Sequence, residues 1–98
     1  MTRQFSAVQM PKWGIEMQQG TVADWHVSVG QQVAKGDPLV DVETDKVLNV
    51  VEAPAAGVLH RVLAAKGDVL PVGALLAVIG AAQAQASDID RFIADMGV

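Results

Sequence analysis

The chain contains no cysteine among its 98 residues. It therefore has no disulfide framework, no thiolate metal site and no cysteine nucleophile. The lack of disulfides is compatible with the cytoplasm, where we expect this protein to reside. Aromatic residues are also scarce, with two Trp and two Phe, although 51% of the residues are hydrophobic. The core must then consist mainly of Val, Leu, Ile and Ala, which favours thin, close-packed sheets over a deep ligand cavity.

Basic residues are few and scattered: there are seven, and the formal net charge is −4. This balance argues against a nucleic-acid groove. The first ten residues lack the apolar stretch of a secretory signal. Residues 69–87 form a nineteen-residue run without charge, but proline, glycine, glutamine and serine interrupt it. We therefore expect one small domain without a membrane span.

Two stretches of the chain match each other at a spacing of 37 residues. The matched glycines are Gly20 with Gly57, Gly30 with Gly67, and Gly36 with Gly73. The matched apolar residues are Val22 with Leu59, Trp25 with Val62, Val33 with Leu70, Leu39 with Leu76, and Val42 with Ile79. Such a duplication predicts two copies that bury their apolar faces against each other about an approximate two-fold axis.

Short β-rich segments separated by turn residues account for most of the chain. The predicted strands are 5–10, 20–27, 39–43, 47–52, 58–63 and 75–79. This spacing indicates an all-β sandwich or flattened barrel. Residues 39–43 and 47–51 should form a hairpin with Thr44-Asp45-Lys46 at its tip. Because Asp-Lys lacks the glycine of the commonest two-residue hairpin turns, we expect a type I turn.

The sequence changes character after residue 80. Residues 81–86 are rich in Ala and Gln and are predicted to form a linker. An amphipathic helix is predicted over 87–97, with Ser87 as its N-cap and Gly97 as its stop. Its apolar face consists of Ile89, Phe92, Ile93 and Met96. A helix of this length is marginal alone in water, so the pattern favours a partly ordered tail or the start of a following region over docking.

Lys46 is the candidate functional residue because it lies at the junction of the two copies, unlike Lys12, Lys35 and Lys66. A lysine amine with a pKa of about 10.4 is protonated at neutral pH. Its expected acidic neighbours are Asp41, Glu43, Asp45 and, across the hairpin, Glu52. Acidic neighbours favour the charged amine, which is unsuitable for a nucleophile or a Schiff base. Lys46 is therefore expected to be a substrate that a separate enzyme acylates.

Other catalytic patterns are absent from the sequence. His26 and His60 lack metal-ligand spacing, so we interpret both as strand or edge residues and expect no metal. No serine lies in a nucleophile elbow, and no glycine cluster resembles a phosphate-binding loop. Trp13 and Trp25 are interpreted as core or loop-packing residues. The chain is thus expected to be a carrier without catalytic residues of its own.

The string Glu43-Thr44-Asp45-Lys46-Val47 closely resembles the lipoylation motif of lipoyl domains from 2-oxo acid dehydrogenase complexes. The resemblance covers about residues 5–80. Biotinyl domains are similar, but they place the lysine between methionines, where this chain has Asp45 and Val47. Two further stretches, Met10–Gly14 with Met17 and Gly67–Leu76, resemble the lipoyl domain of the acetoin dehydrogenase acyltransferase component.

The resemblance implies a flattened barrel of two four-stranded antiparallel sheets over residues 1–80. It implies lipoate in amide linkage to Lys46, with Glu43, Thr44, Asp45 and Val47 as recognition residues at the hairpin tip. The lipoyl group would then act as a swinging arm for acyl groups and electrons. The isolated domain is expected to be monomeric.

The implied partners are a lipoate ligase or transferase, a thiamin-diphosphate-dependent dehydrogenase, the acyltransferase catalytic domain and dihydrolipoyl dehydrogenase. An acetoin dehydrogenase complex is the favoured assignment. The alternatives are a lipoyl domain of another 2-oxo acid dehydrogenase complex, a biotin carrier and an unmodified interaction module.

Overall fold

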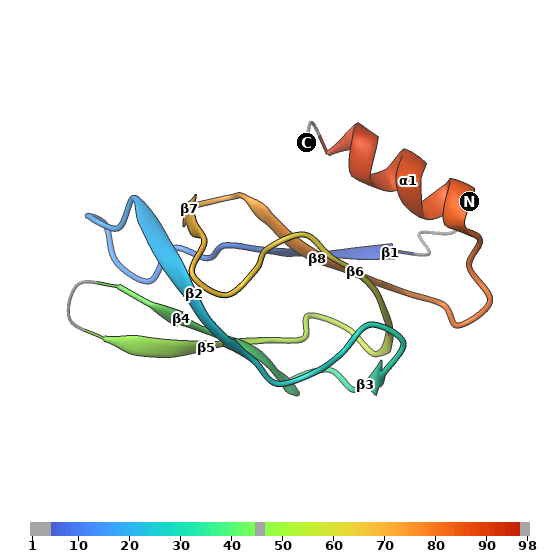
Figure 1. The fold of residues 1–98 in the computed structure, drawn as a ribbon, viewed down its shortest axis with the longest axis horizontal. Helices are drawn as coiled ribbons and strands as arrows, with labels where there is room; N and C mark the ends of the chain where they lie inside the picture. The colour runs from blue at the N-terminus through green and yellow to red at the C-terminus, as the bar shows by residue number, and fades with distance from the viewer. Residues whose placement is uncertain (1–4, 45–46, 97–98) are drawn as a thin grey trace.

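The computed structural model describes residues 5–44 and 47–96. Its strands are β1 (Phe5–Gln9), β2 (Gln19–Trp25), β3 (Gln32–Val33), β4 (Pro38–Glu43), β5 (Leu48–Glu52), β6 (Gly57–Val62), β7 (Val69–Pro71) and β8 (Leu75–Gly80). A helix, α1 (Ala86–Asp95), follows β8. The strands form two layers with the helix outside them (Figure 1).

Each layer is a four-stranded antiparallel sheet, in the orders β1-β8-β6-β3 and β5-β4-β2-β7. The 37-residue spacing relates β2 to β6, β3 to β7, and β4 to β8. The first sheet order becomes the second when each strand is exchanged for its equivalent, with β1 taking the place of β5. The predicted all-β fold with approximate two-fold symmetry is confirmed.

The two shortest strands were not predicted from the sequence. β3 has two residues and β7 has three, which is too short to show an alternating pattern. Each lies at the edge of its sheet and pairs with one neighbour, β6 or β2. The other six strands begin and end within two residues of their predicted bounds. Apolar alternation thus located the long strands, whereas the short edge strands depend on pairing.

The matched apolar residues of the two copies meet in one core. The buried pairs are Val22 with Leu59, Leu39 with Leu76, and Val42 with Ile79. Each of these side chains is at most 1% exposed. Trp25 packs against the same cluster, and its Nε1 donates a hydrogen bond to the Ala64 carbonyl oxygen at 2.9 Å. The prediction of a packing role is therefore confirmed for Trp25.

The first matched glycine pair allows close packing of neighbouring strands. A Cβ on Gly20 would lie 2.5 Å from Val42 Cγ1, and one on Gly57 would lie 2.8 Å from Ile79 Cγ2. Val42 and Ile79 are themselves equivalent in the repeat. The same glycine–aliphatic contact therefore occurs once in each copy, which explains why the glycines and the apolar residues share one spacing.

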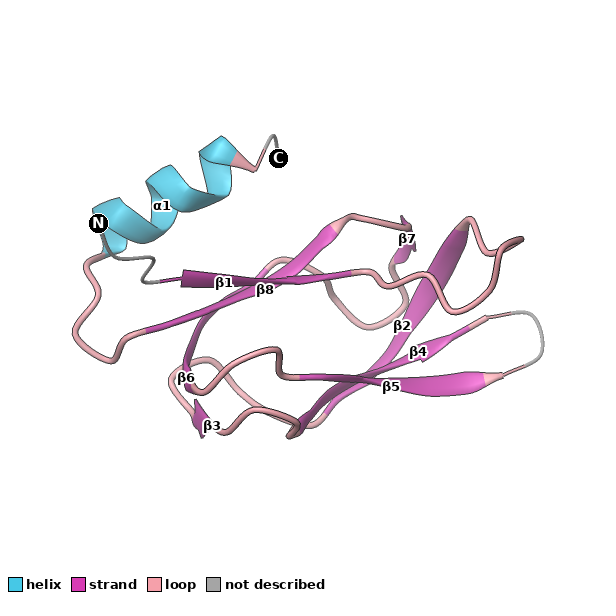
Figure 2. Ribbon diagram, turned by 180° about the vertical axis from the view of Figure 1, so that it is seen from behind, coloured by secondary structure: helices cyan, strands magenta, loops and turns pink. Residues whose placement is uncertain are grey.

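Helix α1 docks on the domain through its apolar face. Ile89 is 2% exposed and packs with the buried Leu75 and Val78 of β8. The rings of Phe5 and Phe92 lie 5.3 Å apart between centroids. Figures 1 and 2 show the helix along β1 and β8, on the outer side of their sheet. The expectation of a partly ordered tail is wrong because β1 and β8 present an apolar outer face to the helix.

The predicted N-cap is also wrong. The backbone N–H of Ile89 already donates to the Gln85 carbonyl oxygen at 3.1 Å, so Ser87 lies within the first turn. Gln85 is the N-cap, with extended backbone angles and no side-chain capping bond. Ser87 resembled a cap by residue type, but the hydrogen bonds of the first turn already begin at the Gln85 carbonyl oxygen. The predicted stop at Gly97 lies outside the described residues.

Among the described residues, no helix is long and apolar enough to cross a membrane. The uncharged run 69–87 is divided among β7, β8, a turn and the beginning of α1. Every residue of β8 is buried, which accounts for the high local hydropathy. The run is thus the central strand of a sheet together with its flanks. The proposed division into a domain, a linker at 81–86 and a further region stays a prediction.

Replacing Gly57 with alanine should destabilise the fold. The new Cβ would lie 2.8 Å from both the Gly80 carbonyl oxygen and Ile79 Cγ2. The carbonyl oxygen belongs to the backbone of β8, which cannot move aside as a flexible side chain could. We expect a loss of about 1–3 kcal/mol in the free energy of unfolding, measured by urea denaturation. Gly14→Ala is the control, because no atom lies within 4 Å of its Cβ position. Equal losses in both variants would contradict the close-packing explanation.

Replacing Ile89 with alanine should release helix α1 from the sheet. The change removes the most buried side chain of a helix that is marginal alone. We expect the free energy of helix opening to fall by about 2 kcal/mol or more, measured by hydrogen exchange of the helix amides. Arg91→Ala, on an exposed position of the same helix, should leave exchange almost unchanged. Unaltered protection in the Ile89 variant would show that the helix does not depend on this contact.

Candidate carrier hairpin

The site is built on the hairpin of β4 and β5. Its register pairs Val40 with Val51, Asp41 with Val50, and Glu43 with Leu48. Val40 and Val51 belong to the core, as does Val42 further along β4. Alternate residues of the hairpin are thus held by inter-sheet packing. This confirms the predicted hairpin for its described strands.

A hydrogen bond closes the hairpin one residue beyond the strands. The Thr44 backbone N–H donates to the Val47 carbonyl oxygen at 2.9 Å, and Thr44 Oγ1 donates to the same oxygen at 3.3 Å. Glu43 is exposed, Thr44 is half-buried and Val47 is 54% exposed. Three of the five predicted site residues are therefore brought together beside the turn. Asp45 and Lys46, with the predicted turn type, lie outside the described residues.

The acidic residues expected around the tip are spread along the hairpin. Glu52 pairs with Pro38, at the end of the hairpin remote from Glu43. Asp41 lies between the two ends, opposite Val50. Glu52 is close to Lys46 in the sequence, but it is the last residue of β5. In an antiparallel hairpin that residue pairs with the first residue of β4, at the end opposite the turn. Of the four acids predicted near the tip, Glu43 is the described one that lies there.

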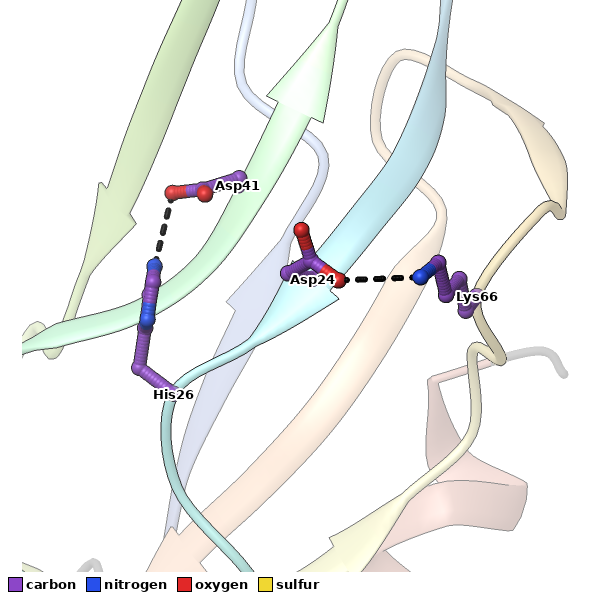
Figure 3. A network of polar contacts seen from close by, with 4 residues as sticks. All are labelled: Asp24, His26, Asp41 and Lys66. Carbon is purple, nitrogen blue, oxygen red and sulfur yellow. Dashed lines mark hydrogen bonds and ion pairs between the residues drawn. The ribbon is translucent and has the colours of Figure 1, made fainter.

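The two histidines take part in structural contacts. His26 Nε2 and Asp41 Oδ1 are 2.8 Å apart, which joins the end of β2 to β4 (Figure 3). Figure 3 also shows the neighbouring ion pair of Lys66 and Asp24, whose Nζ–Oδ1 distance is 3.2 Å. His60 Nε2 donates to the Ala81 carbonyl oxygen at 2.7 Å. His60 lies in β6, as predicted, whereas His26 lies one residue beyond the end of β2 and not within a strand.

Within residues 5–44 and 47–96, no three His, Cys, Asp or Glu side chains group together to hold a metal ion. Within the same ranges, no buried side-chain nitrogen or oxygen lacks a hydrogen-bond partner. The described side chains thus form neither a metal centre nor a strained polar pocket. What the described part of this end presents is the exposed Glu43 and Val47 and the surface beside them.

A groove lies beside the hairpin, between β4–β5 and the loop that joins β1 to β2. Its volume is about 640 Å³. The loop and the start of β2 contribute Trp13, Gly14, Glu16, Met17, Gln18 and Gln19. The hairpin contributes Thr44, Val47 and Asn49. Figures 1 and 2 show this loop at the same end of the molecule as the end of β4 and the start of β5, away from α1.

The loop is held in a defined shape. The Met17 backbone N–H donates to the Gly14 carbonyl oxygen at 3.1 Å, and the Trp13 N–H points to Met17 Sδ at 3.4 Å. The Val72 N–H donates to the Gln18 carbonyl oxygen at 3.0 Å. Met17 packs against the core, whereas Trp13 is 39% exposed and lines the groove. Trp13 is therefore a partly exposed loop residue beside the site, and of the two roles predicted for it the core role is wrong.

Sequence reasoning did not assign these loop residues to the site. About thirty positions separate Trp13 from Lys46, and no spacing rule relates them. The one available signal was that Met10–Gly14 with Met17 belongs to the stretch that resembles acetoin-type lipoyl domains. That resemblance marked the loop as distinctive but gave no reason to place it near the hairpin.

Two four-stranded sheets related by an internal repeat, with a protruding hairpin at the repeat junction, define the biotinyl/lipoyl class of carrier domain. The family of biotin- and lipoyl-attachment domains, described as "Biotin-requiring enzyme", matches residues 6–79. The chain belongs to this family.

The relatives refine this assignment. The dihydrolipoyllysine-residue acetyltransferase component of the acetoin cleaving system from Cupriavidus necator is 51% identical over 87 residues, covering 89% of this chain. The chain spans 23% of that protein's length. The lipoyl domain of the 2-oxoglutarate dehydrogenase complex from Azotobacter vinelandii aligns with a TM-score of 0.59 and 35% identity, covering 74% of this chain and 95% of that domain.

The fold is also shared with part of a carboxylase. The urea carboxylase of Kluyveromyces lactis aligns with a TM-score of 0.67 and 26% identity, covering 81% of this chain and 6% of that protein. The predicted lipoyl domain, most similar to that of the acetoin system, is confirmed by the closer sequence identities. The chain is a carrier domain.

Proposed function

We propose that Lys46 carries lipoate in amide linkage and presents it to the active sites of an acetoin-cleaving complex. The supporting observation is the hairpin. Its closing hydrogen bond joins Thr44 to Val47, and the sequence has only Asp45 and Lys46 between them. A single primary amine thus belongs to the turn of a hairpin whose strands are anchored in the core.

The donor chemistry of this segment fits lipoate. The attachment requires one amine, which must lose a proton and attack the carboxyl carbon of an activated lipoyl group, whose activating group then leaves. A lipoate ligase or transferase must supply that activation, since the described hairpin residues include no cationic side chain and their carboxylates favour the charged amine. Glu43, Thr44, Asp45 and Val47 are proposed as the residues that the modifying enzyme recognises.

Bound lipoate would supply a disulfide that takes up an acyl group with two electrons and is later reoxidised. The domain itself contributes presentation. A carrier attached to the complex raises the local concentration of its arm at each active site without adding new contacts. The core holds the two strands that flank the attachment segment.

The proposed partners are the thiamin-diphosphate-dependent dehydrogenase, the acyltransferase catalytic domain and dihydrolipoyl dehydrogenase, in the cytoplasm. The name and 51% identity of the Cupriavidus necator relative support an acetoin complex and an acyltransferase component. The Azotobacter vinelandii domain supports the alternative of a 2-oxoglutarate complex. A biotin carrier, suggested by the carboxylase fold, is disfavoured because Asp45 and Val47 replace the flanking methionines.

Lys46→Arg should abolish lipoylation while the fold is retained, because a guanidinium does not form the same amide. The chain is coexpressed with a lipoate ligase, and intact-protein mass spectrometry measures the added lipoyl mass. Lys35→Arg and Lys66→Arg are the matched controls and should be lipoylated as fully as the wild type. A lipoyl adduct that persists on the Lys46 variant would refute the assigned attachment site.

Lipoylation should also make recognition by the dehydrogenase dependent on salt. Amide formation removes the Lys46 charge and lowers the formal net charge of −4 by one. The exposed Glu43 and the groove residue Glu16 then keep their negative charges, while Lys46 no longer contributes a positive one. The partner should present a basic surface, so kcat/KM for reductive acylation should fall as ionic strength rises. A rate that is independent of salt between low and physiological ionic strength would contradict this prediction.

A further inference from the structure

We propose that the groove between the β1–β2 loop and the β4–β5 hairpin is a resting site for the lipoyl group carried by the same chain. This inference rests on the proposed attachment at Lys46. It concerns the described groove residues, chiefly Trp13, Met17 and Val47, and what they do for the arm between reactions. The occupant is the alkyl chain and dithiolane ring of the attached lipoyl group.

The chemistry of the groove suits this occupant. Trp13 contributes an indole, Met17 a thioether and Val47 an isopropyl group. Sulfur atoms make favourable contacts with aromatic rings, and alkyl chains leave water readily for such surfaces. Trp13 is 39% exposed and Val47 is 54% exposed at the groove wall. An apolar arm in the groove would cover part of this exposed apolar surface.

The connectivity of the chain puts the arm at the rim of the groove. Thr44 and Val47, which line it, flank the two-residue segment that contains Lys46. An attached arm therefore needs no free diffusion to reach Trp13. The tether gives the arm a high effective concentration at the groove. A shallow groove that binds a free ligand too weakly to retain it can therefore still be occupied by the attached arm for much of the time.

The acidic side chain in the groove distinguishes a tethered group from a free one. Glu16 lines the groove together with the uncharged Gln18, Gln19 and Asn49. Free lipoate has a carboxylate, which Glu16 repels, whereas the amide-linked lipoyl group has no charge. The groove thus fits lipoate after attachment and not before. A resting arm would be shielded from water and would leave the groove when a partner enzyme binds the tip.

The two tryptophans provide an internal comparison for the test. Trp13 lines the groove, whereas Trp25 Nε1 is hydrogen-bonded to Ala64 and does not line it. The 15N-labelled chain is prepared in unmodified and lipoylated forms, and mass spectrometry first establishes one lipoyl group on Lys46. We expect the indole N–H resonance of Trp13 to shift on lipoylation and that of Trp25 to stay in place. Free lipoate added to the unmodified chain should shift neither resonance.

A variant that fills the groove should remove the effect. Gly14 lines the groove, and no atom lies within 4 Å of its Cβ position, so Gly14→Leu adds a side chain there without a backbone clash. The difference in the Trp13 resonance between unmodified and lipoylated forms should fall by at least about half. Ala94→Leu adds the same side chain at an exposed position of α1 and should preserve the wild-type difference.

Loss of the lysine charge alone could alter Trp13, and Lys46→Gln controls for it. Its Trp13 resonance should match that of the unmodified wild type; a shift equal to that of the lipoylated chain would overturn the inference. So would a fully lipoylated chain whose Trp13 resonance is unchanged, and in that case the proposed function would stand. Absence of a lipoyl group on Lys46 would instead refute the proposed function, and this inference with it.

Discussion

Contact between two equivalent sheets is the interaction on which the rest of the structure depends. Val42 of one copy and Ile79 of the other both belong to the core between the sheets, and each also packs over a glycine on the neighbouring strand of its own sheet. Close packing of this kind leaves little room for an extra methyl group, which is why glycine is needed at Gly20 and Gly57. One packing solution, used twice, provides a core for a chain with four aromatic residues in all.

The functional end of the molecule follows from this core. Val40, Val42 and Val51 fasten the hairpin to the opposite sheet, while the intervening residues face outward. The hairpin therefore reaches its turn as an extension of the sandwich. A carrier needs little else at this position, since the modifying enzyme and the partner enzymes supply the chemistry. The groove beside the hairpin adds the surface on which we propose that the lipoyl arm rests.

Helix α1 occupies the other end of the domain and solves a different problem. Leu75 and Val78 of β8 belong to a second apolar cluster, separate from the main core, and Ile89 of α1 packs against them. Phe5 joins this second cluster from β1. The separation of α1 from the hairpin, visible in Figures 1 and 2, leaves the carrier end open to partners. Packing and presentation thus use opposite ends of one elongated body.

Much of this arrangement could be predicted from local patterns. The repeat spacing of 37 residues identified the paired core residues, and the apolar alternation identified the six longer strands. Errors arose at the ends of elements. Ser87 resembled a helix cap, but the helix begins two residues earlier, with Gln85 as its N-cap. Glu52 was expected near the tip, but strand register paired it with Pro38.

By itself the sequence determined the duplication, the hairpin and the single lysine at the junction, because each depends on residue types and short spacings. Tertiary structure alone decided that α1 docks and that Trp13 and Met17 lie across a groove from Thr44 and Val47. The groove joins residues about thirty positions apart, and the contact of Phe5 with Phe92 joins β1 to α1 across most of the chain, so only folding brings them together. No local propensity encodes them, since they arise from the way the sheets and their connecting loops pack.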